Sequence, residues 1–359
     1  MRRTLQPLAL AGAAGASALA AAGFSGIVSF GPPPPKKDAS PPMPQPVAGG
    51  VREDGVEAAF NYQSRSVNKI STRRDGSAAD GVLIGANWQP QRVLVRDGRK
   101  ATPKHNLDKN GFALVTDVPP AVDYYDEANV VETYYEACEA LVRDATGARL
   151  VVAFDHNVRC DTAKALGRRL RGGGVRVEGP AALVHNDYGP EAAARRLQML
   201  TGSPDLLKNS LRARLGGKPA LHGQLADDAL TGRARFAYIN VWRPIQTIES
   251  KPLGLLDAQT SGTAELVPFV IEHADEGSTG GIFFASHRDE HRWHFFPSMA
   301  PDEAILLKQW DSSGGVANGT TDKAAGRATF ALHSAFADAG SAPTARDRES
   351  IETRLVVIY

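Results

Sequence analysis

Cysteine is scarce in this sequence. Cys138 and Cys160 are the two cysteines among 359 residues, too few for a disulfide scaffold and too few for a structural zinc site built from thiolates. Any metal must therefore be bound by histidine and carboxylate side chains. Because Cys138 falls in a helical pattern and Cys160 lies just after a strand pattern, we expect both to be free thiols.

An excess of charge of either sign is also absent. Lysine and arginine together number 41, against 40 aspartate and glutamate residues, so no global field favours nucleic acid or an anionic membrane surface. We therefore expect a small-molecule substrate as the partner, no nucleic acid and no stable membrane insertion of the folded domain. Nothing in the composition fixes an oligomeric state.

The N-terminal segment lacks acidic residues until Asp38. Arg2 and Arg3 stand before a weakly apolar run over Leu8–Ala22, which is too short and too rich in alanine and glycine to span a bilayer. Over residues 1–30 this composition is typical of a secretory signal or an organellar transit peptide. Without either function, the protein would be cytoplasmic.

Proline is concentrated in the next segment, where Pro32–Pro35 are consecutive. This composition predicts an extended linker over residues 31–50. No internal repeat and no second low-complexity break divides the rest of the chain, so we expect a single folded domain over residues 51–359.

Helical patterns come first in that domain. Apolar residues recur at helical spacing between Tyr124 and Ala148 and predict a long amphipathic helix. A short apolar run over Leu150–Phe154 predicts a buried strand. We expect two further helices, over Ala163–Leu170 and Gly189–Leu200.

After Thr231 the pattern changes to short β-like segments separated by turn residues. They are Phe236–Trp242, Glu265–Ile271, Gly281–Ser286, Ala304–Asp311, Ala328–Phe336 and Ile351–Tyr359. Helices followed by a run of strands indicate an α+β fold whose antiparallel strands form a barrel or double sheet. We expect a double-stranded β-helix, or jelly roll, as the core, with helices flanking it.

A candidate metal site begins at His185-Asn186-Asp187. In an extended segment, residues two apart project from the same face, so one ion can bind both side chains. A third ligand from a distant strand would complete a facial triad of two histidines and one carboxylate, which leaves positions open for co-substrate and dioxygen. His333, in an apolar run, is the candidate for that ligand.

Arg348-Glu349-Ser350 follows His333 at the start of another strand pattern. A planar guanidinium can bind a buried carboxylate through two hydrogen bonds, and a serine hydroxyl can donate a third. An oxygenase that uses 2-oxoglutarate needs these groups for the distal carboxylate of that co-substrate. The order His-x-Asp, distant His, Arg-x-Ser is far more specific than any one of its elements.

Each element also has a purely structural interpretation. His185 is then a hydrogen-bonded surface histidine, Asp187 the N-cap of the following helix, His333 a core histidine and Arg348 the partner of a neighbouring acidic residue. His291 is a rival to His333, because His287, His291 and His294 cluster around Trp293. The joint occurrence of all elements in the required order favours the metal site.

A series of segments carries a resemblance to a known family. They are Asp155–Arg159, His185–Tyr188, Asn240–Pro244, Pro252–Asp257, His291–Trp293 with Glu303 and Lys308–Asp311, His333–Phe336 and Arg348–Arg354. From about Asp155 to the C-terminus the chain resembles the asaB-type hydroxylase/desaturase family, which includes gibberellin-desaturase-like and cephamycin-hydroxylase-like proteins. That family resembles the iron and 2-oxoglutarate dioxygenases.

The resemblance implies a non-haem iron catalytic domain that uses Fe(II), 2-oxoglutarate and O2. Its motifs match His185, Asp187 and His333 as metal ligands and Arg348 with Ser350 as co-substrate contacts, with Arg354 as the alternative arginine. Further residues are candidates for the substrate or the cavity wall. They are Asn240, Trp242, Arg243, His156, His291 and Trp293.

The reaction implied by the resemblance is hydroxylation or desaturation of a small organic metabolite, typical of secondary metabolism, coupled to conversion of 2-oxoglutarate to succinate and CO2. Two other functions use the same scaffold. One is a metal-dependent hydrolase with zinc on the same ligands, and the other is a non-catalytic jelly-roll binding protein.

Overall fold

The computed structural model describes residues 40–74, 82–116, 118–119, 121–172, 175–204, 214–273 and 277–359. They fall in one compact unit, Asp38–Tyr359. The expected targeting segment over residues 1–30, and the part of the expected linker before residue 40, lie outside the described residues. Among the described helices, none has the length and apolar character needed to cross a bilayer.

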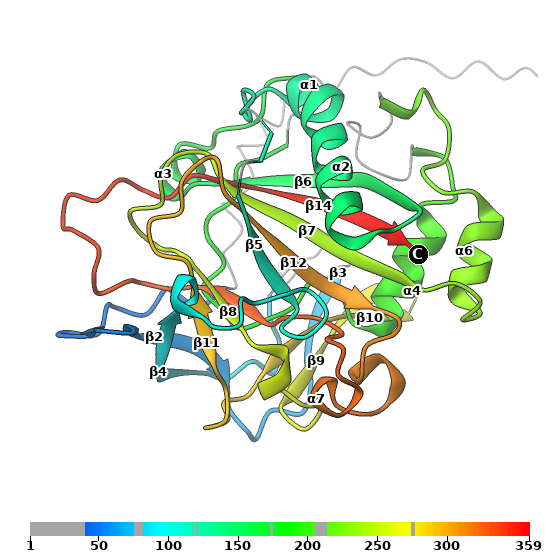
Figure 1. Cartoon of the computed structure of the whole chain (residues 1–359). Coiled ribbons are helices and arrows are strands. Elements are labelled where there is room, and N and C mark those ends of the chain that lie inside the picture. The colour runs from blue at the N-terminus through cyan, green and yellow to red at the C-terminus, as the bar shows by residue number, and fades with distance from the viewer. Residues whose placement is uncertain are drawn as a thin grey trace, which may run out of the picture. The chain divides into compact units, whose positions relative to one another are not determined.

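A five-stranded antiparallel sheet forms one layer of the core (Figure 1). Its strands, in spatial order, are β5 (Phe112–Val115), β12 (Ala304–Asp311), β7 (Phe236–Pro244), β14 (Ser350–Ile358) and β6 (Leu150–Arg159). Four of them, β6, β7, β12 and β14, cover segments that the sequence patterns predicted as strands. The C-terminal strand β14 lies between β6 and β7 and pairs with both.

The second layer consists of two groups of strands. One has the order β1 (Val51–Arg52), β2 (Gly55–Gln63), β4 (Trp88–Asp97), β11 (Trp293–Phe295), β8 (Leu253–Leu256) and β13 (His333–Ala335). The other has the order β10 (Gly277–Ala285), β9 (Leu266–His273) and β3 (Ile70–Arg74). His185 forms bridges to His333 of β13 and to Phe284 of β10, so its segment joins the two groups into one sheet.

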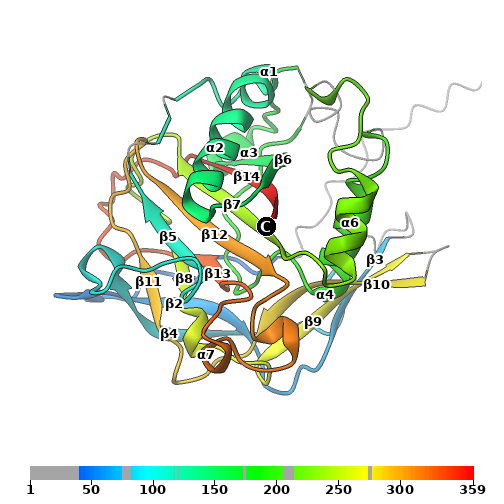
Figure 2. The same cartoon turned by 45° about the vertical axis from the view of Figure 1, so that its right-hand side comes forward.

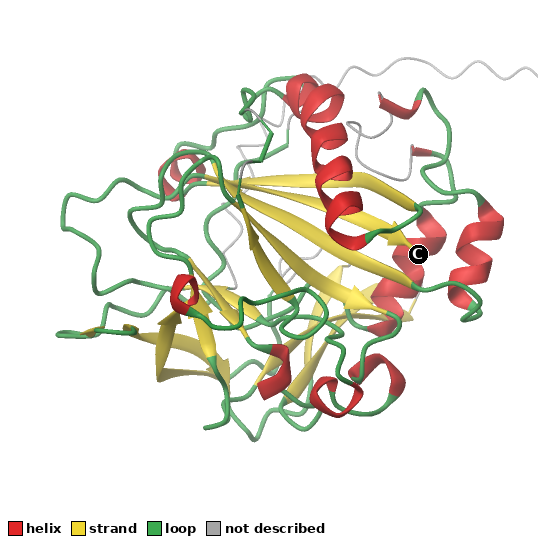
Figure 3. Cartoon of the chain, in the orientation of Figure 1, coloured by secondary structure: helices red, strands yellow, loops and turns green. Residues whose placement is uncertain are grey.

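The two layers make the jelly roll that the sequence predicted, with helices around it (Figure 3). The expected long helix is present as α1 (Glu127–Asn129), a π-helical turn η2 (Val130–Tyr134) and α2 (Tyr135–Thr146). The Asp126 side chain accepts hydrogen bonds from the first turn, and Gly147 ends the helix in a left-handed conformation with φ 67°. Buried apolar side chains of α2 pack on the outer face of the five-stranded sheet.

Helix α4 (Pro190–Met199) begins just after the candidate metal segment, as predicted. In α4, Glu191 Oε2 accepts a hydrogen bond of 2.7 Å from the backbone N–H of Gly280, which fixes the helix against β10. Figure 2 shows α4 beside β9 and β10, with α6 (Gly223–Leu230) next to it. The expected helix over Ala163–Leu170 is shorter, α3 (Asp161–Ala165), because Gly167 turns the chain at φ 65°.

The order of elements differs from the predicted one at its beginning. The sequence patterns indicated helices first and strands afterwards, but β1 to β5 precede α1. In β4 the residues Gln89–Arg92 are mostly exposed, so the strand carries no clear apolar alternation. The segment Ala328–Phe336, expected to be one strand, contains only the short β13.

Candidate metal centre

His185 and His333 face each other across an antiparallel bridge. The His185 N–H donates to His333 O over 3.2 Å, and the His333 N–H donates to His185 O over 2.8 Å. The two ring centroids are 4.4 Å apart. Residues that exchange both backbone hydrogen bonds project their side chains to the same face of the sheet, so the pairing itself brings the two imidazoles together inside the jelly roll.

Asp187 completes the group. One ligand atom from each of His185, Asp187 and His333 can be chosen so that all three lie within 4.8 Å of one another. The His185 Nε2 to Asp187 Oδ1 distance is 3.7 Å. Asp187 is not the N-cap of α4, because Gly189 occupies that position. The structure therefore brings the three predicted ligands together and leaves the carboxylate of Asp187 without a capping role.

Both imidazoles are oriented by backbone carbonyls. His185 Nδ1 lies 2.8 Å from Leu183 O, and His333 Nδ1 lies 3.2 Å from Ala331 O. A carbonyl only accepts, so Nδ1 carries the proton and Nε2 keeps its lone pair for a metal. Burial, reinforced by the neighbouring His333 ring, lowers the pKa of His185 to about 3. His185 is therefore a neutral ligand at physiological pH.

Asp187 is held by three groups from other strands. Its Oδ2 accepts a hydrogen bond of 2.9 Å from Asn240 Nδ2, its backbone N–H donates to Gln309 Oε1 over 3.0 Å, and Arg354 Nε lies 3.7 Å from Oδ2. Burial raises the pKa of the Asp187 carboxyl, but Arg354 and the two histidines outweigh it and lower that pKa to about 2. The carboxylate is thus ionised and oriented.

A cavity beside these ligands also holds an arginine that the sequence singled out. Its lining residues are Arg159, Ala181, His185, Asp187, Trp242, Leu253, His333, Ala335, Arg348 and Glu352. Arg348 is 2% exposed. Among the described residues, its guanidinium donates one hydrogen bond, from NH1 to Lys251 O, over 2.8 Å. Its Nε and the Ser350 hydroxyl are buried without a hydrogen-bond partner. Burial, with Arg159 nearby, lowers the pKa of Arg348 to about 9.

Arg354 has a different environment from Arg348. Its NH1 forms an ion pair of 2.9 Å with Asp155 Oδ2, in addition to its contact with Asp187. Burial lowers the pKa of Arg354, but the two carboxylates outweigh burial and the net shift is upward. Arg354 therefore already has carboxylate partners, whereas Arg348 has none within hydrogen-bond distance among the described residues.

The register of β14 explains this arrangement. Ser350, Glu352 and Arg354 alternate along the strand and face the interior. Each lies opposite a residue of β6 and a residue of β7. The three cross-strand rows are Arg159–Ser350–Pro244, Asn157–Glu352–Trp242 and Asp155–Arg354–Asn240. The predicted cavity residues Asn240 and Trp242 therefore do face the metal centre.

Arg243 does not face the cavity, in contrast to the expectation from the sequence. It follows Trp242 in β7, and successive strand residues project to opposite faces. Its Nε donates to Pro301 O over 2.8 Å, and its guanidinium carbon lies 5.7 Å from each of the ring centroids of Tyr124 and Tyr134. Arg243 therefore lies under the π-helical turn, outside the jelly roll.

His156 also lies on the outer face. It pairs with Thr353 between β6 and β14, and its Nδ1 is 2.8 Å from the hydroxyl of Tyr135 in α2. The neighbouring Asp155 faces inward and binds Arg354. The expectation that His156 lines the cavity is therefore wrong, because successive residues of β6 project to opposite faces and Asp155 is the one that points inward.

His291 and Trp293 belong to a separate polar cluster. His291 Nδ1 lies 2.9 Å from the Tyr62 hydroxyl, which also accepts a hydrogen bond of 2.7 Å from Trp293 Nε1. His291 Nε2 is 3.4 Å from Glu265 Oε1. Neither residue lines the cavity of the three ligands, so the structure separates this rival histidine from His185.

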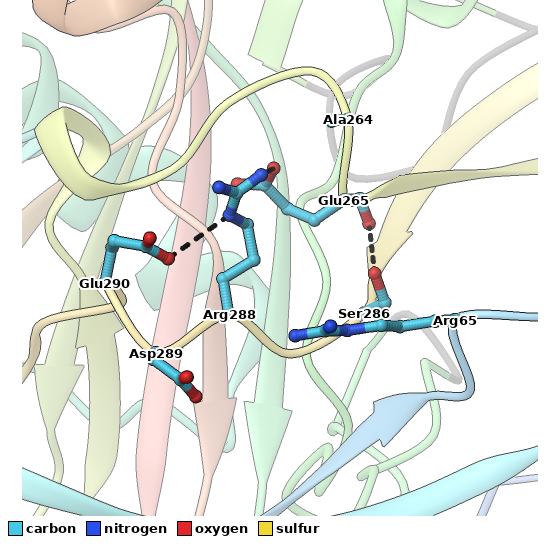
Figure 4. A pocket seen from close by; sticks show the side chains of 7 residues that line it. All are labelled: Arg65, Ala264, Glu265, Ser286, Arg288, Asp289 and Glu290. Atoms are coloured by element: carbon cyan, nitrogen blue, oxygen red, sulfur yellow. Dashed lines mark hydrogen bonds and ion pairs between the residues drawn. The ribbon is translucent and has the colours of Figure 1, made fainter.

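A surface pocket lies next to that cluster and is shown in Figure 4. Its charged residues compensate one another: Arg288 Nε is 3.4 Å from Glu290 Oε2, and Arg288 NH1 is 3.8 Å from Glu265 Oε2. Among the described residues, the His185 group is the one set of three or more histidine, cysteine and acidic side chains placed to bind a metal.

Two charged residues of the cavity wall, Arg159 and Glu352, were not assigned from the sequence. The signal for Glu352 was present, because it lies between Ser350 and Arg354 at the same two-residue spacing. Glu352 accepts a hydrogen bond from Asn240, which thereby bridges it to Asp187. In β6, Asp155, Asn157 and Arg159 have the same two-residue spacing and therefore face the same side of the sheet.

Comparisons with known proteins identify the family. Residues 57–358 match the family described as an oxidoreductase/YMDC permease-like domain. The hydroxylase/desaturase efuI of Hormonema carpetanum is 31% identical over 331 residues, covering 87% of this chain and 98% of that protein. The alpha-ketoglutarate-dependent dioxygenase phiK of a fungal species is 24% identical over 310 residues, covering 86% of this chain and 98% of the relative.

A solved structure has the same fold. The iron and alpha-ketoglutarate-dependent endoperoxidase NvfI matches with a TM-score of 0.66 at 22% identity, over 86% of this chain and 99% of that one. The match extends well beyond the strands around His185 and includes the N-terminal half of the domain. It supports the jelly-roll architecture derived from strand order and register.

Proposed function

This chain belongs to the asaB-type hydroxylase/desaturase family, and we propose from that premise that it is an Fe(II)/2-oxoglutarate-dependent oxygenase with His185, Asp187 and His333 as its iron ligands. The single observation that carries the residue assignment is the convergence of the three side chains in a cavity that also contains a buried arginine. The substrate is a small organic metabolite, which is hydroxylated or desaturated.

The donor set fits iron(II). Two neutral imidazole nitrogens and one ionised carboxylate on one face of an ion make the facial triad of non-haem iron oxygenases. The depressed pKa values of His185 and Asp187 mean that neither ligand has to lose a proton at neutral pH. The scarcity of cysteine agrees with a site that binds through nitrogen and oxygen.

The buried donor groups beside the three ligands match the distal carboxylate of 2-oxoglutarate. A guanidinium buried without a carboxylate partner is costly unless an anion joins it. The unpartnered Arg348 Nε and Ser350 Oγ are two buried donors from residues two apart, and Ser350 is the first residue of β14. We assign them to the distal carboxylate of the co-substrate, and we assign Arg354 to holding Asp187, because Arg354 is already paired with Asp155.

Iron(II) and 2-oxoglutarate, when bound, supply the oxidation of an unactivated C–H bond by O2, with succinate and CO2 as the other products. The chain's own residues prepare that chemistry. Asn240 and Arg354 fix the Asp187 carboxylate, Arg348 and Ser350 position the co-substrate, and Trp242 with Leu253 forms an apolar wall that limits the entry of water.

An anaerobic titration tests the proposal. Addition of Fe(II) and then 2-oxoglutarate to the full chain should produce a weak visible charge-transfer band, and admission of O2 should yield succinate. Asp187→Ala should lose both the band and succinate formation. Asp289→Ala is the matched control, because the Asp289 side chain is 94% exposed.

Two outcomes would contradict the proposal. A normal band in folded Asp187→Ala would refute the ligand assignment. Turnover of a metabolite with zinc, independent of 2-oxoglutarate, would favour the metal-dependent hydrolase instead.

A further inference from the structure

A second cavity, of about 440 Å³, adjoins the metal centre. Its lining residues are Asp155, Asp187, Tyr188, Ala192, Arg195, Arg196, Met199, Ile271, Gly280, Gly281, Ile282 and Arg354. Asp187 lines this cavity and also the cavity of the three ligands. A molecule in the second cavity therefore lies next to the proposed iron ligand, on the side that Arg348 does not occupy.

The walls come from three parts of the fold. Helix α4 contributes Arg195, Arg196 and Met199, the β9–β10 hairpin contributes Ile271 and Ile282, and the five-stranded sheet contributes Asp155 and Arg354. Most of this wall area is apolar, because Ala192, Met199, Ile271 and Ile282 are aliphatic or thioether side chains. A cavity of this size and character is typical of a site for a small organic molecule.

The charged residues in the wall do not cancel. Three arginines and two aspartates line the cavity, an excess of one positive charge. Asp155 and Asp187 both contact Arg354, so these three residues carry a formal charge of −1 and the two arginines of α4 carry +2. No described carboxylate forms an ion pair with Arg196, whose guanidinium carbon lies 5.6 Å from the centroid of the Phe154 ring.

We propose that this cavity binds the substrate and that Arg196 recognises a carboxylate on an otherwise apolar molecule. The assignment to the substrate rests on the proposed oxygenase function. A single excess positive charge matches a monoanion better than a phosphate dianion, which Asp155 and Asp187 would repel. The planar guanidinium can bind a carboxylate through two hydrogen bonds, and the apolar walls hold the rest of the molecule beside Asp187.

A matched pair of ligands tests this inference. The probes are 4-phenylbutanoate and 4-phenylbutanamide, which share the apolar part and differ in the charge. Dissociation constants are measured by calorimetry on the full chain, anaerobically, with Fe(II) and saturating 2-oxoglutarate so that the Arg348 site is filled. The carboxylate should bind about tenfold more tightly than the amide, which corresponds to about 1.4 kcal/mol.

Substitutions locate the preference. In Arg196→Gln the two ligands should bind within about twofold of each other, with the loss confined to the carboxylate. Arg92→Gln is the matched control, since Arg92 is an exposed arginine of β4 outside the cavity. Melting temperatures should show that both variants remain folded.

The results separate this inference from the proposed function. Three results would overturn the carboxylate site: equal binding of the two ligands to the unaltered chain, no measurable binding of the carboxylate, or an equal loss for both ligands in Arg196→Gln. In each case the visible band would still report bound Fe(II) and 2-oxoglutarate. Absence of that band in the unaltered chain refutes the oxygenase function itself.

Discussion

Asn240 provides the sharpest test of how the metal centre is organised. Its Nδ2 donates to Asp187 Oδ2 over 2.9 Å and also to Glu352 Oε1, so one amide lies between two carboxylates. Asn240→Leu keeps a similar volume but removes both hydrogen bonds. Asp187 would then lose an orienting donor and stand next to Glu352 without the amide between them.

The size of the effect follows from these contacts. A hydrogen bond to a charged group contributes about 1.5–3 kcal/mol, and groups that orient metal ligands typically change metal affinity by about 10- to 100-fold when they are removed. We expect the dissociation constant for Fe(II) to rise within that range in Asn240→Leu. The like charge of Glu352 should raise the pKa of Asp187, which acts in the same direction.

The assay is an anaerobic Fe(II) titration of the unaltered chain and of Asn240→Leu in parallel. Asn129→Leu serves as the control, because Asn129 is exposed and its side chain makes no capping hydrogen bond. Urea unfolding of each variant separates loss of affinity from loss of fold. An Fe(II) affinity within about twofold of the unaltered chain, in a folded Asn240→Leu protein, would refute the argument that Asn240 orients Asp187.

Three other predictions follow from buried ionisable groups. Arg348→Gln should raise the 2-oxoglutarate concentration for half-maximal succinate formation by about 30- to 100-fold while Fe(II) affinity stays within about twofold; a change in iron affinity alone would contradict the co-substrate role. Asp311, fully buried beside Arg235 and Lys308, has a lowered pKa because Arg235 and Lys308 outweigh burial. Asp311→Asn should therefore lower the free energy of unfolding by about 3 kcal/mol at pH 7. This difference should shrink as the pH falls below roughly 4, and urea unfolding at two pH values measures it. Cys138 is a buried free thiol of α2 whose pKa is raised to about 12 by burial, so a thiol reagent should modify it only as fast as the protein opens; rapid native labelling would contradict its burial between α2 and the five-stranded sheet.

Local spacing and the family resemblance together indicated two of the three candidate ligands. His185 and Asp187 lie two residues apart in an extended segment, and that spacing alone places both side chains on one face. The distant His333 could be ranked above His291 only through the Arg348 and Ser350 that follow it. The structure supplies the physical reason for that choice, the backbone bridge between His185 and His333, which pairs residues far apart in the chain.

The sequence prediction placed Arg243 and His156 on the wrong face of the sheet, because the pairing register decides which residues of a strand point inward. Trp242 and Arg243 are neighbours in a motif, and the motif does not say which of them points inward. The pairing of Trp242 with Glu352 and of Arg243 with Ile351 decides it. His156 is outside for the same reason, through its pairing with Thr353. Of the N-terminal strands, β4 was missed because its exposed residues hide the alternation that identifies a strand. Strand β2 does carry that alternation, with Val56, Ala58, Phe60 and Tyr62 buried.

The three candidate ligands are therefore held by two different means. Two sets of contacts hold the histidines: the hydrogen bonds between their backbones, and the backbone carbonyls that accept a hydrogen bond from each Nδ1. Asp187 lies where the chain leaves the sheet to enter α4, so side chains must orient it, and Asn240, Gln309 and Arg354 do so. Because Asp187 and Arg354 also line the second cavity, the ligand with the least backbone support is the one that a bound substrate touches. Substrate binding should therefore alter the metal centre through Asp187 before it affects either histidine.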